Sequence, residues 1–283
     1  MKTVKLVSEV RAEICSMKKK GQRIGFVPTM GYLHEGHLSL VKRSVEECDA
    51  TVVSIFVNPT QFGPAEDYSR YPRDSARDGE LLRSRDTDLL FIPTVEEIYG
   101  EGFSTFVEVG GLSEKLEGSI RPGHFRGVCT VVCKLFNIVS PDKAYFGWKD
   151  AQQLIIIRKM SEELNIPVEI EGCPIFREAD GLAASSRNVY IPREKRRYAV
   201  ALYMGLSRIR DLLDNHGIRD ASRLLKEGRK TVEEYPGVEL QYLEIVDPDD
   251  LSTVKTIDGK VLILGAIRIS GVRLIDNMFA GDK

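Results

Sequence analysis

The feature that most constrains the fold is the segment ATVVSIFVNP at residues 50–59, which is rich in β-branched residues and almost entirely apolar. A strand with one face in water alternates apolar and polar side chains, and this segment does not, so we expect it to be buried on both faces. Strands of that kind occur in parallel sheets that helices cover on both sides. The segment therefore predicts an α/β protein.

The first 176 residues repeat an order of strand-like and helix-like segments. Strands are expected at 23–29, 50–59, 87–93, 143–147 and 166–172, and helices at 36–47, 73–86, 124–139 and 150–164. Strands that alternate with helices pair in parallel through crossover connections. We therefore expect an open, Rossmann-like, doubly wound parallel sheet.

The pattern changes after about residue 176. Helices are expected at 193–214 and 219–234, followed by strands at 238–247, 260–269 and 272–278. Ser270-Gly271 separates the last two strands and is typical of a two-residue hairpin turn. We expect residues 1–176 to form the ligand-binding domain, and residues 177–283 to form a smaller α+β domain that closes over it as a lid.

The balance of charged residues and the cysteines indicate which ligands the protein can bind and in which cellular compartment it is located. Lys plus Arg number 40 and Asp plus Glu number 42, so no basic surface for nucleic acid is expected, and an anionic ligand must be held by local positive charge. The N-terminal segment lacks the apolar centre of a signal peptide, and no apolar run is long enough to span a membrane. We expect a cytoplasmic protein with five free, buried thiols, although a disulfide or a metal site remains an alternative.

The segment PTMGYLHEGHLSL at residues 28–40 places His34 and His37 three residues apart where a helix is expected to begin, directly after a strand. Ligands of open parallel sheets bind at the carboxyl ends of the strands, and a helix N-terminus favours phosphate. Gly36 leaves room for a nucleotide to approach the backbone. Two alternatives stay open, because the histidines could be ordinary helix-start residues or a zinc pair.

Further polar groups follow the second and fourth strands. The amides of Asn58 and Gln61 suit hydroxyl and carboxylate ligands, although they could instead cap a proline-containing loop. Lys149 and Gln153 follow the strand at 143–147, and a later loop, READGLAASSRN, ends in a cation at Arg187. A single ligand-binding pocket explains why polar groups recur at the ends of these strands better than unrelated structural roles would.

Six motifs together resemble the pantoate–β-alanine ligase (pantothenate synthetase) family, a branch of the HIGH-motif nucleotidyltransferases. They are PTMGYLHEGHLSL, FVNPTQF, YPRD, HFRGV, FGWKDAQQL and READGLAASSRN, in the family's order and spacing over essentially the whole chain. The resemblance implies an ATP-dependent ligase that joins pantoate to β-alanine through a pantoyl adenylate and releases AMP and pyrophosphate. It also implies Mg²⁺, a homodimer, and a first domain that binds both nucleotide and pantoate.

The resemblance assigns roles to residues by their place in these motifs. It implies that the catalytic phosphate contacts come from His34, His37, Lys149, Ser185, Ser186 and Arg187. The expected ATP site adds Met30, Gly31, Tyr32, Leu33, Glu35, Gly36, Gly147, Trp148, Asp150, Phe176 and Ala184. Gln61, Gln153 and Asn58 are expected to bind pantoate and β-alanine, and no protein ligand of the metal is assigned. Arg121 and His124 are either pocket wall or loop brace, whereas Arg177 and Asp180 are expected to brace their loop.

Two positions depart from the family pattern. Trp148 replaces a residue that is usually polar or acidic, and Ala184 replaces a common methionine. Trp148 could stack on adenine or pack within the protein, and we expect altered affinity rather than lost activity. Two other functions remain open: a related nucleotidyltransferase with a phosphate acceptor, against which the amides Gln61 and Gln153 argue, and a nucleotide-sensing module without turnover.

Overall fold

The computed structural model describes residues 1–64 and 66–281, which divide into two compact units. The first unit comprises Met1–Gly147 and Gln152–Pro174. The second comprises Trp148–Ala151 and the chain from Ile175 onward. Each unit has its own sheet, and we describe each separately.

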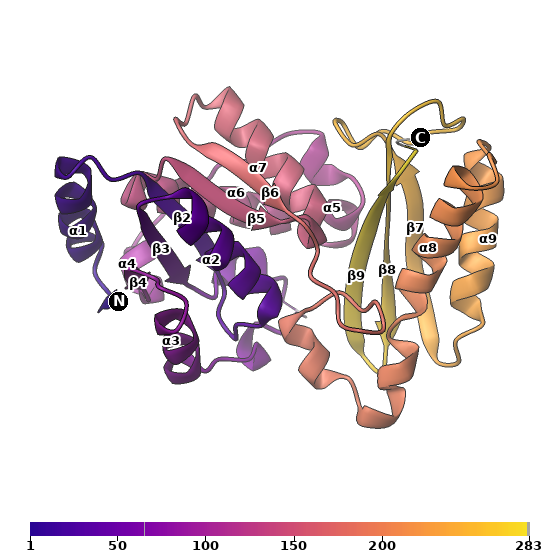
Figure 1. The fold of residues 1–283 in the computed structure, drawn as a ribbon, viewed down its shortest axis with the longest axis horizontal. Coiled ribbons are helices and arrows are strands. Elements are labelled where there is room, and N and C mark those ends of the chain that lie inside the picture. Colours follow the sequence, from indigo (N-terminus) through magenta and orange to yellow (C-terminus); the bar gives the residue numbers. More distant parts are fainter. Residues whose placement is uncertain (65, 282–283) are drawn as a thin grey trace. The chain divides into compact units, whose positions relative to one another are not determined.

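The first unit is built on a six-stranded sheet in which every pairing is parallel, with the order β1-β4-β3-β2-β5-β6 (Figure 1). Its strands are β1 (Lys2–Val4), β2 (Ile24–Thr29), β3 (Ala50–Ile55), β4 (Leu89–Phe91), β5 (Lys143–Gly147) and β6 (Glu169–Cys173). From β2 the chain proceeds to β3 on one side, whereas from β5 it proceeds to β6 on the other. The carboxyl ends of β2 and β5 therefore mark the switch point at which such sheets bind ligands. The predicted Rossmann-like doubly wound fold is confirmed.

Helices cover both faces of this sheet. They are α1 (Val7–Lys19), α2 (Glu35–Glu47), α3 (Ser75–Arg83), α4 (Val95–Ile98), α5 (Glu117–Ile120), α6 (His124–Val139) and α7 (Ala151–Glu163). Successive strand residues point to opposite faces, so Phe26 meets Phe136 of α6 while Val27 packs in the cluster that contains Leu38 of α2. This double covering explains why β3 is buried along its whole length.

Several predicted bounds need correction. The strand predicted at 50–59 ends at Ile55, because Asn58 caps a 3₁₀ turn at Pro59–Gln61 and draws the chain away from the sheet. The N-terminal strand β1 and helix α1 were not predicted, because charges interrupt their apolar pattern. The helix at 124–139 and the strand at 143–147 lie where the sequence places them.

The second unit packs two helices on a three-stranded antiparallel sheet (Figure 1). The helices are α8 (Ala201–Asp214) and α9 (Ala221–Glu233), and the strands are β7 (Val238–Val246), β8 (Val261–Ile269) and β9 (Val272–Ala280). Ser270 and Gly271 both have positive φ, at 48° and 81°, so they form the predicted two-residue hairpin turn. The helix predicted at 193–214 is instead a 3₁₀ turn at Arg193–Tyr198 followed by α8.

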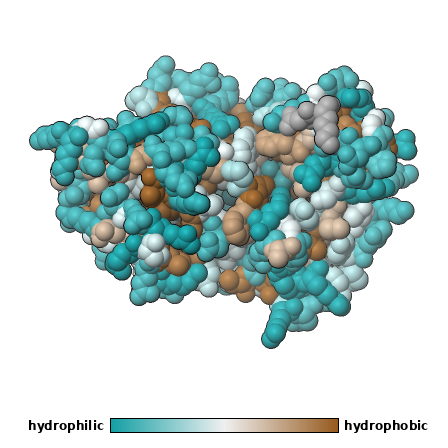
Figure 2. All heavy atoms as spheres, in the orientation of Figure 1, coloured by the Kyte–Doolittle hydropathy of each residue, from teal (hydrophilic) through white to brown (hydrophobic). Residues whose placement is uncertain are grey.

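The surface and the thiols can be compared with expectation. Among the described residues, no helix is both long and apolar enough to cross a membrane, and the face drawn in Figure 2 is mostly hydrophilic. All five cysteines are free thiols, as predicted. Cys129 and Cys173 are buried, but Cys15 is exposed, so the expectation that all five are buried was wrong.

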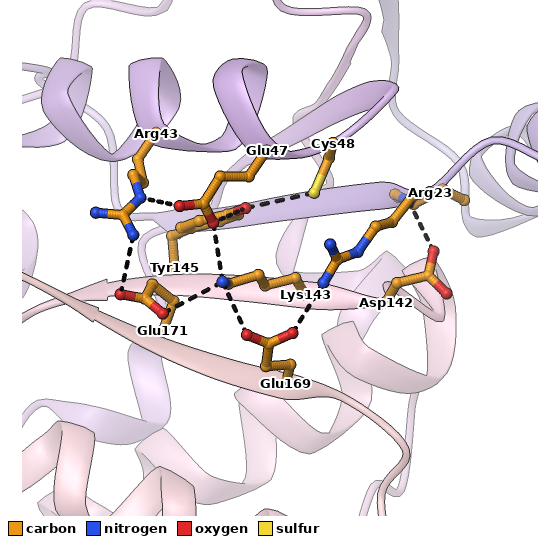
Figure 3. A network of polar contacts seen from close by, with 10 residues as sticks. Arg23, Arg43, Glu47, Cys48, Asp142, Lys143, Tyr145, Glu169 and Glu171 are labelled. Carbon is orange, nitrogen blue, oxygen red and sulfur yellow. Dashed lines mark hydrogen bonds and ion pairs between the residues drawn. The ribbon is translucent and has the colours of Figure 1, made fainter.

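A polar network joins the end of α2 to β5 and to the edge strand β6 (Figure 3). The Lys143 ammonium, whose side chain is 9% exposed, lies 2.8 Å from both Glu47 and Glu169 and 3.3 Å from Glu171. Glu169 and Glu171 are two residues apart on β6, so both side chains point to the same face of the sheet, the face that α2 covers. Charged side chains on an edge strand discourage pairing with another chain.

Candidate active site

The loop that follows β2 is held by a buried carboxylate on α3. Asp78, which is 1% exposed, accepts hydrogen bonds from the backbone nitrogens of Tyr32 at 2.6 Å and Leu33 at 2.8 Å. Burial raises the pKa of Asp78, and these hydrogen bonds oppose that rise. Gly31 has a φ of 83°, and a Cβ there would lie 2.8 Å from the Ile55 side chain, so this turn requires glycine.

His34 and His37 form a reciprocal cap at the start of α2. Nδ1 of His34 accepts a hydrogen bond from the Gly36 backbone at 3.1 Å, and Nδ1 of His37 accepts one from the His34 backbone at 3.4 Å. The ring centroids are 4.0 Å apart. A neutral imidazole carries one proton, so an acceptor role for Nδ1 places that proton on Nε2 of each ring. The helix-start alternative and the phosphate-donor prediction are thus compatible, since capping uses Nδ1 of each ring and a phosphate contact would use the N–H at Nε2.

The other predicted residues of this loop have different environments. Leu33 is 1% exposed and its side chain packs in the core, while its backbone N–H donates to Asp78 and its carbonyl accepts from Arg77 at 3.0 Å. Glu35 is exposed and lies 3.6 Å from Arg85. In the part of the chain that the structure describes, no group of three or more His, Cys, Asp or Glu side chains is arranged to hold a metal ion.

Asn58 and Gln61 are buried and bonded to each other, at 1% and 9% exposure. Asn58 Nδ2 donates to Gln61 Oε1 at 3.1 Å, and Gln61 Nε2 donates to the Met30 sulfur at 3.2 Å. The 3₁₀ turn thereby reaches the loop after β2. Asn58 also accepts from Thr60 and Tyr99, which favours the capping alternative for Asn58 itself.

Arg121 and His124 brace this turn from the other side. Arg121 pairs with both carboxylate oxygens of Glu66, at 2.7 and 2.6 Å, and donates to His124 Nε2 at 3.1 Å. Burial, with the Arg121 charge, lowers the pKa of His124 to about 4, so its neutral ring donates from Nδ1 to the Gln61 carbonyl at 2.8 Å. This geometry favours the loop-brace alternative for both residues. Gly127 permits the close approach, because a Cβ there would lie 2.4 Å from the Thr60 carbonyl oxygen.

Two adjacent glutamines at the start of α7 differ sharply. Gln152 is 4% exposed, accepts from the Glu117 backbone at 3.1 Å, and donates to the carbonyls of Leu112 and Lys115 at 2.9 and 2.8 Å. Gln153 is half-buried, and among residues 1–64 and 66–281 its amide has no hydrogen-bond partner. An amide left open in this way is available to a ligand, whereas its neighbour is structural.

In the second unit, a single amide holds the segment that carries Lys149. Asn277, 3% exposed, donates from Nδ2 to the carbonyls of Trp148 at 2.7 Å and Lys149 at 3.0 Å. The Trp148 ring meets Phe279 edge to face, with centroids 4.8 Å apart, which favours the packing alternative over stacking on adenine. Lys149 lies 3.5 Å from Asp150.

The loop of residues 175–190 contacts the middle of β9. Arg177 donates to both oxygens of Asp276, at 2.6 and 2.9 Å, and to the Gly181 carbonyl at 3.0 Å. Asp180 pairs with Arg196 at 2.7 Å, so both loop residues brace, as predicted. Burial raises the pKa of Asp276, and the bonds with Arg177 oppose that rise.

The predicted ligand residues of this loop are closely linked. Ala184 donates its backbone N–H to the Phe176 carbonyl at 2.9 Å, and Ser185 accepts from the Arg187 backbone at 3.3 Å. Ser186 is buried at 6% exposure, and Phe176 is 41% exposed. The structure thus groups Met30, Asn58 and Gln61 in the first unit, and Phe176, Ala184, Ser185 and Arg187 in the second.

Sequence reasoning missed the residues that hold these groups in place, namely Asp78, Tyr99, Asp276 and Asn277. Asp78 resembles an ordinary acidic residue in the first turn of a helix, and Asp276 and Asn277 lie in a strand-like run. No spacing rule connects them with the site, because these hydrogen bonds join residues that lie 41 to 129 positions apart in sequence.

Comparison with known proteins agrees with this geometry. The family model for pantoate-beta-alanine ligase matches residues 2–279. Pantothenate synthetase from Thermotoga petrophila is 53% identical over 281 residues, which cover 99% of this chain and 100% of the relative. The pantothenate synthetase from Heliobacterium modesticaldum is 52% identical over 278 residues, with 98% and 99% covered.

Solved structures agree over the same length. Pantothenate synthetase from Thermus thermophilus superposes with a TM-score of 0.94 at 47% identity, covering 98% of this chain and 99% of that one. The pantoate-beta-alanine ligase from Francisella tularensis, solved in complex with Beta-gamma ATP and beta-alanine, gives a TM-score of 0.81 at 36% identity, covering 98% and 97%. With half of its residues shared along the full length of such relatives, and with the capped histidine pair and the buried amides in place, this chain belongs to the pantoate–β-alanine ligase family.

Proposed function

We propose that this chain joins pantoate to β-alanine in two half-reactions driven by ATP. A carboxylate oxygen of pantoate attacks the α-phosphorus of ATP, and pyrophosphate leaves as the acyl adenylate forms. The amine of β-alanine then attacks the acyl carbon, AMP leaves, and loss of a proton gives the amide pantothenate. The observation that carries the proposal is the full-length match to this family, including a relative solved with Beta-gamma ATP and beta-alanine.

The histidine pair supports the first step. Each Nε2–H is a neutral donor at the carboxyl end of β2, and negative charge increases on the phosphate oxygens during transfer. Nucleotidyl transfer depends on positioning and charge stabilisation rather than on a covalent enzyme nucleophile. We therefore assign His34 and His37 to the phosphates, and Met30, Gly31, Tyr32, Leu33, Glu35 and Gly36 to the loop that surrounds the ATP site.

Lys149, Ser185, Ser186 and Arg187 are assigned to the phosphate tail as well, and Gly147 and Asp150 to the adenosine part of ATP. Phe176, Ala184 and the backbone at Trp148 are assigned to the ATP site. These assignments follow the family motifs rather than any ligand contact. The turn held by Asn277 fixes the backbone at Lys149. Magnesium would enter with ATP, because Mg²⁺ is usually held by substrate phosphates with one or two carboxylates and water.

Gln61 and Gln153 are assigned to pantoate, with Gln61 also bordering β-alanine. Among the described residues the Gln153 amide has no hydrogen-bond partner, which supports this assignment. A hydroxyl or carboxylate oxygen of pantoate would accept a hydrogen bond from this amide. We place Asn58 behind Gln61, as a support for that side chain. A nucleotidyltransferase with a phosphate acceptor fits less well, because cations rather than neutral amides would then be expected here.

The test is a product analysis. The protein is incubated with ATP, Mg²⁺, pantoate and β-alanine, and pantothenate, AMP and pyrophosphate are quantified by mass spectrometry and phosphate assay. We expect the three products in equal amounts, with none when pantoate is omitted. ADP in place of AMP, or nucleotide transfer to a phosphorylated acceptor, would contradict the proposal.

We also propose that the protein is a homodimer and that it is located in the cytoplasm. Light scattering of the purified protein tests the dimer.

A further inference from the structure

A chain of hydrogen bonds runs from Tyr99 to Gln61. The Tyr99 hydroxyl, directly after α4, donates to Asn58 Oδ1 at 2.8 Å and lies 3.2 Å from the Thr60 hydroxyl. Its ring contacts Phe56 and Phe103, with centroid distances of 6.1 and 4.9 Å, and two polar partners hold its hydroxyl. Burial raises the pKa of Tyr99, so the hydroxyl keeps its proton and acts as a donor at neutral pH.

The orientation of the Asn58 amide is fixed by groups with only one hydrogen-bonding role. Its Oδ1 accepts from the Thr60 backbone nitrogen at 3.3 Å, which can only donate, and its Nδ2 donates to the Gly127 carbonyl at 3.1 Å, which can only accept. The second N–H of Asn58 therefore points to Gln61 at 3.1 Å.

This arrangement determines how the Gln61 amide is presented. Asn58 Nδ2 is a donor, so Gln61 must turn its oxygen toward Asn58 and its Nε2 the other way, toward the Met30 sulfur at 3.2 Å. A thioether is a weak acceptor. A carboxylate or hydroxyl oxygen of a ligand is a much better acceptor for the same N–H group.

We propose that Tyr99 is a positioning residue for the acid substrate, acting through Asn58 to hold Gln61 as a hydrogen-bond donor. The inference rests on the proposed function, because it uses the assignment of Gln61 to pantoate. The Tyr99 bond is the shortest that Asn58 makes. Without it Asn58 keeps its orientation but loses the contact that fixes its position, and Gln61 loses alignment.

The test compares Tyr99→Phe with Phe103→Leu. The first change removes one hydroxyl and keeps the ring, whereas the second loosens the ring packing and keeps the hydroxyl. We expect Tyr99→Phe to raise the KM for pantoate roughly fivefold to tenfold, the effect typical of one lost buried hydrogen bond, with the KM for ATP unchanged. Phe103→Leu should lower the melting temperature and leave the KM for pantoate unchanged. Equal changes in both KM values, no change, or the same rise in Phe103→Leu would overturn the inference.

A second measurement does not depend on turnover. The side-chain amide signals of Asn58 and Gln61 are followed by NMR in the wild type and in Tyr99→Phe, and we expect faster hydrogen exchange at both amides in the variant. Unchanged exchange rates would overturn the positioning role of Tyr99 even if the wild type makes pantothenate. Faster exchange in a protein that makes no pantothenate would support the positioning role and refute the proposed function instead. A double-mutant cycle with Gln61→Ala completes the test, because the Tyr99→Phe effect on pantoate should vanish when Gln61 is absent.

Discussion

The carboxylate of Asp78 lies 2.8 Å from the backbone nitrogen of Leu33, although 45 residues separate them in sequence. Its other oxygen accepts from the Tyr32 nitrogen at 2.6 Å. A residue on α3 thus fixes the turn that leads to the capped histidines on α2. The geometry of the proposed phosphate donors therefore depends on a buried acid that holds the backbone just before them.

Replacing Asp78 with asparagine should destabilise this turn. One of the two backbone N–H groups would then face an NH₂ group, and a buried donor without an acceptor costs about 1–3 kcal/mol. We expect the free energy of unfolding to fall by about that amount, and the KM for ATP to rise. Urea denaturation and steady-state kinetics measure both effects.

Asp74→Asn is the matched control for that substitution. Asp74 caps the same helix by accepting from the Arg77 nitrogen at 3.0 Å, and asparagine caps equally well. Its stability and kinetics should remain close to wild type. Equal behaviour of the two variants would mean that Asp78 has no special role in the turn.

The paired glutamines predict opposite effects. Gln153→Ala should raise the KM for pantoate far more than the KM for ATP and leave stability nearly unchanged, since the described part of the protein offers its amide no partner. Gln152→Ala should lower the free energy of unfolding by about 1–3 kcal/mol, because it removes the hydrogen bonds that this buried amide makes to the backbone of Leu112, Lys115 and Glu117. If Gln153→Ala affects both substrates equally, its assignment to pantoate is wrong.

Asn277 should control the position of Lys149. In Asn277→Asp, carboxylate oxygens replace the NH₂ group that donates to the carbonyls of Trp148 and Lys149. Repulsion should displace this turn, so we expect a higher KM for ATP and lower turnover. Asn215→Asp, an exposed amide on the same unit, should change neither quantity. An unchanged KM for ATP in Asn277→Asp would show that the position of this turn does not affect ATP binding.

The network around Lys143 predicts an acid dependence of stability. Hydrogen bonding from Lys143, and further bonds from Arg43 and Tyr145, outweigh burial and lower the pKa of Glu47 from 4.5 to about 2. A carboxyl group with a lowered pKa stabilises the fold above its unfolded pKa, so this contribution is present above about pH 4.5 and is lost as the pH falls toward 2.

Glu47→Gln should therefore lose stability at pH 7, by about 1–3 kcal/mol, and show a weaker pH dependence between pH 4.5 and 2. Glu46→Gln is the control, because Glu46 is exposed and its ion pair, with Lys42 at 3.7 Å, lies on the surface of the same helix. Chemical denaturation across this pH range measures both variants. The same acid slope in Glu47→Gln as in the wild type would contradict the account of the network.

The sequence predicted most of the sheet, because apolar strands such as ATVVSIFVNP and helices such as 124–139 carry strong periodic signals. It did not predict β1 and α1, whose charged residues, among them Glu9 and Lys18, mask a short apolar face built on Val10 and Ile14. It also extended β3 by four residues, because the capping role of Asn58 competes with its place at the end of an apolar run.

For the site, motifs identified the residues expected to face a ligand, but not those that position them. Gln152 and Gln153 are chemically identical neighbours. Tertiary contacts give Gln152 a structural role, whereas the Gln153 amide has no hydrogen-bond partner among the described residues. Similarly, nothing local connects Tyr99 with Gln61 or Asn277 with Lys149. Such pairs arise from the packing of distant segments, so they become visible only in the folded chain.

The most direct test of the central claim is the exchange of labelled pyrophosphate into ATP, in the presence of Mg²⁺ and the absence of β-alanine. We predict exchange that requires pantoate, and we predict that His37→Ala lowers its rate by about 10²–10³-fold without loss of fold, as expected when one donor to a transition-state oxyanion is removed. No exchange from a folded protein that binds ATP, or exchange that is independent of pantoate, would contradict the formation of a pantoyl adenylate by this chain.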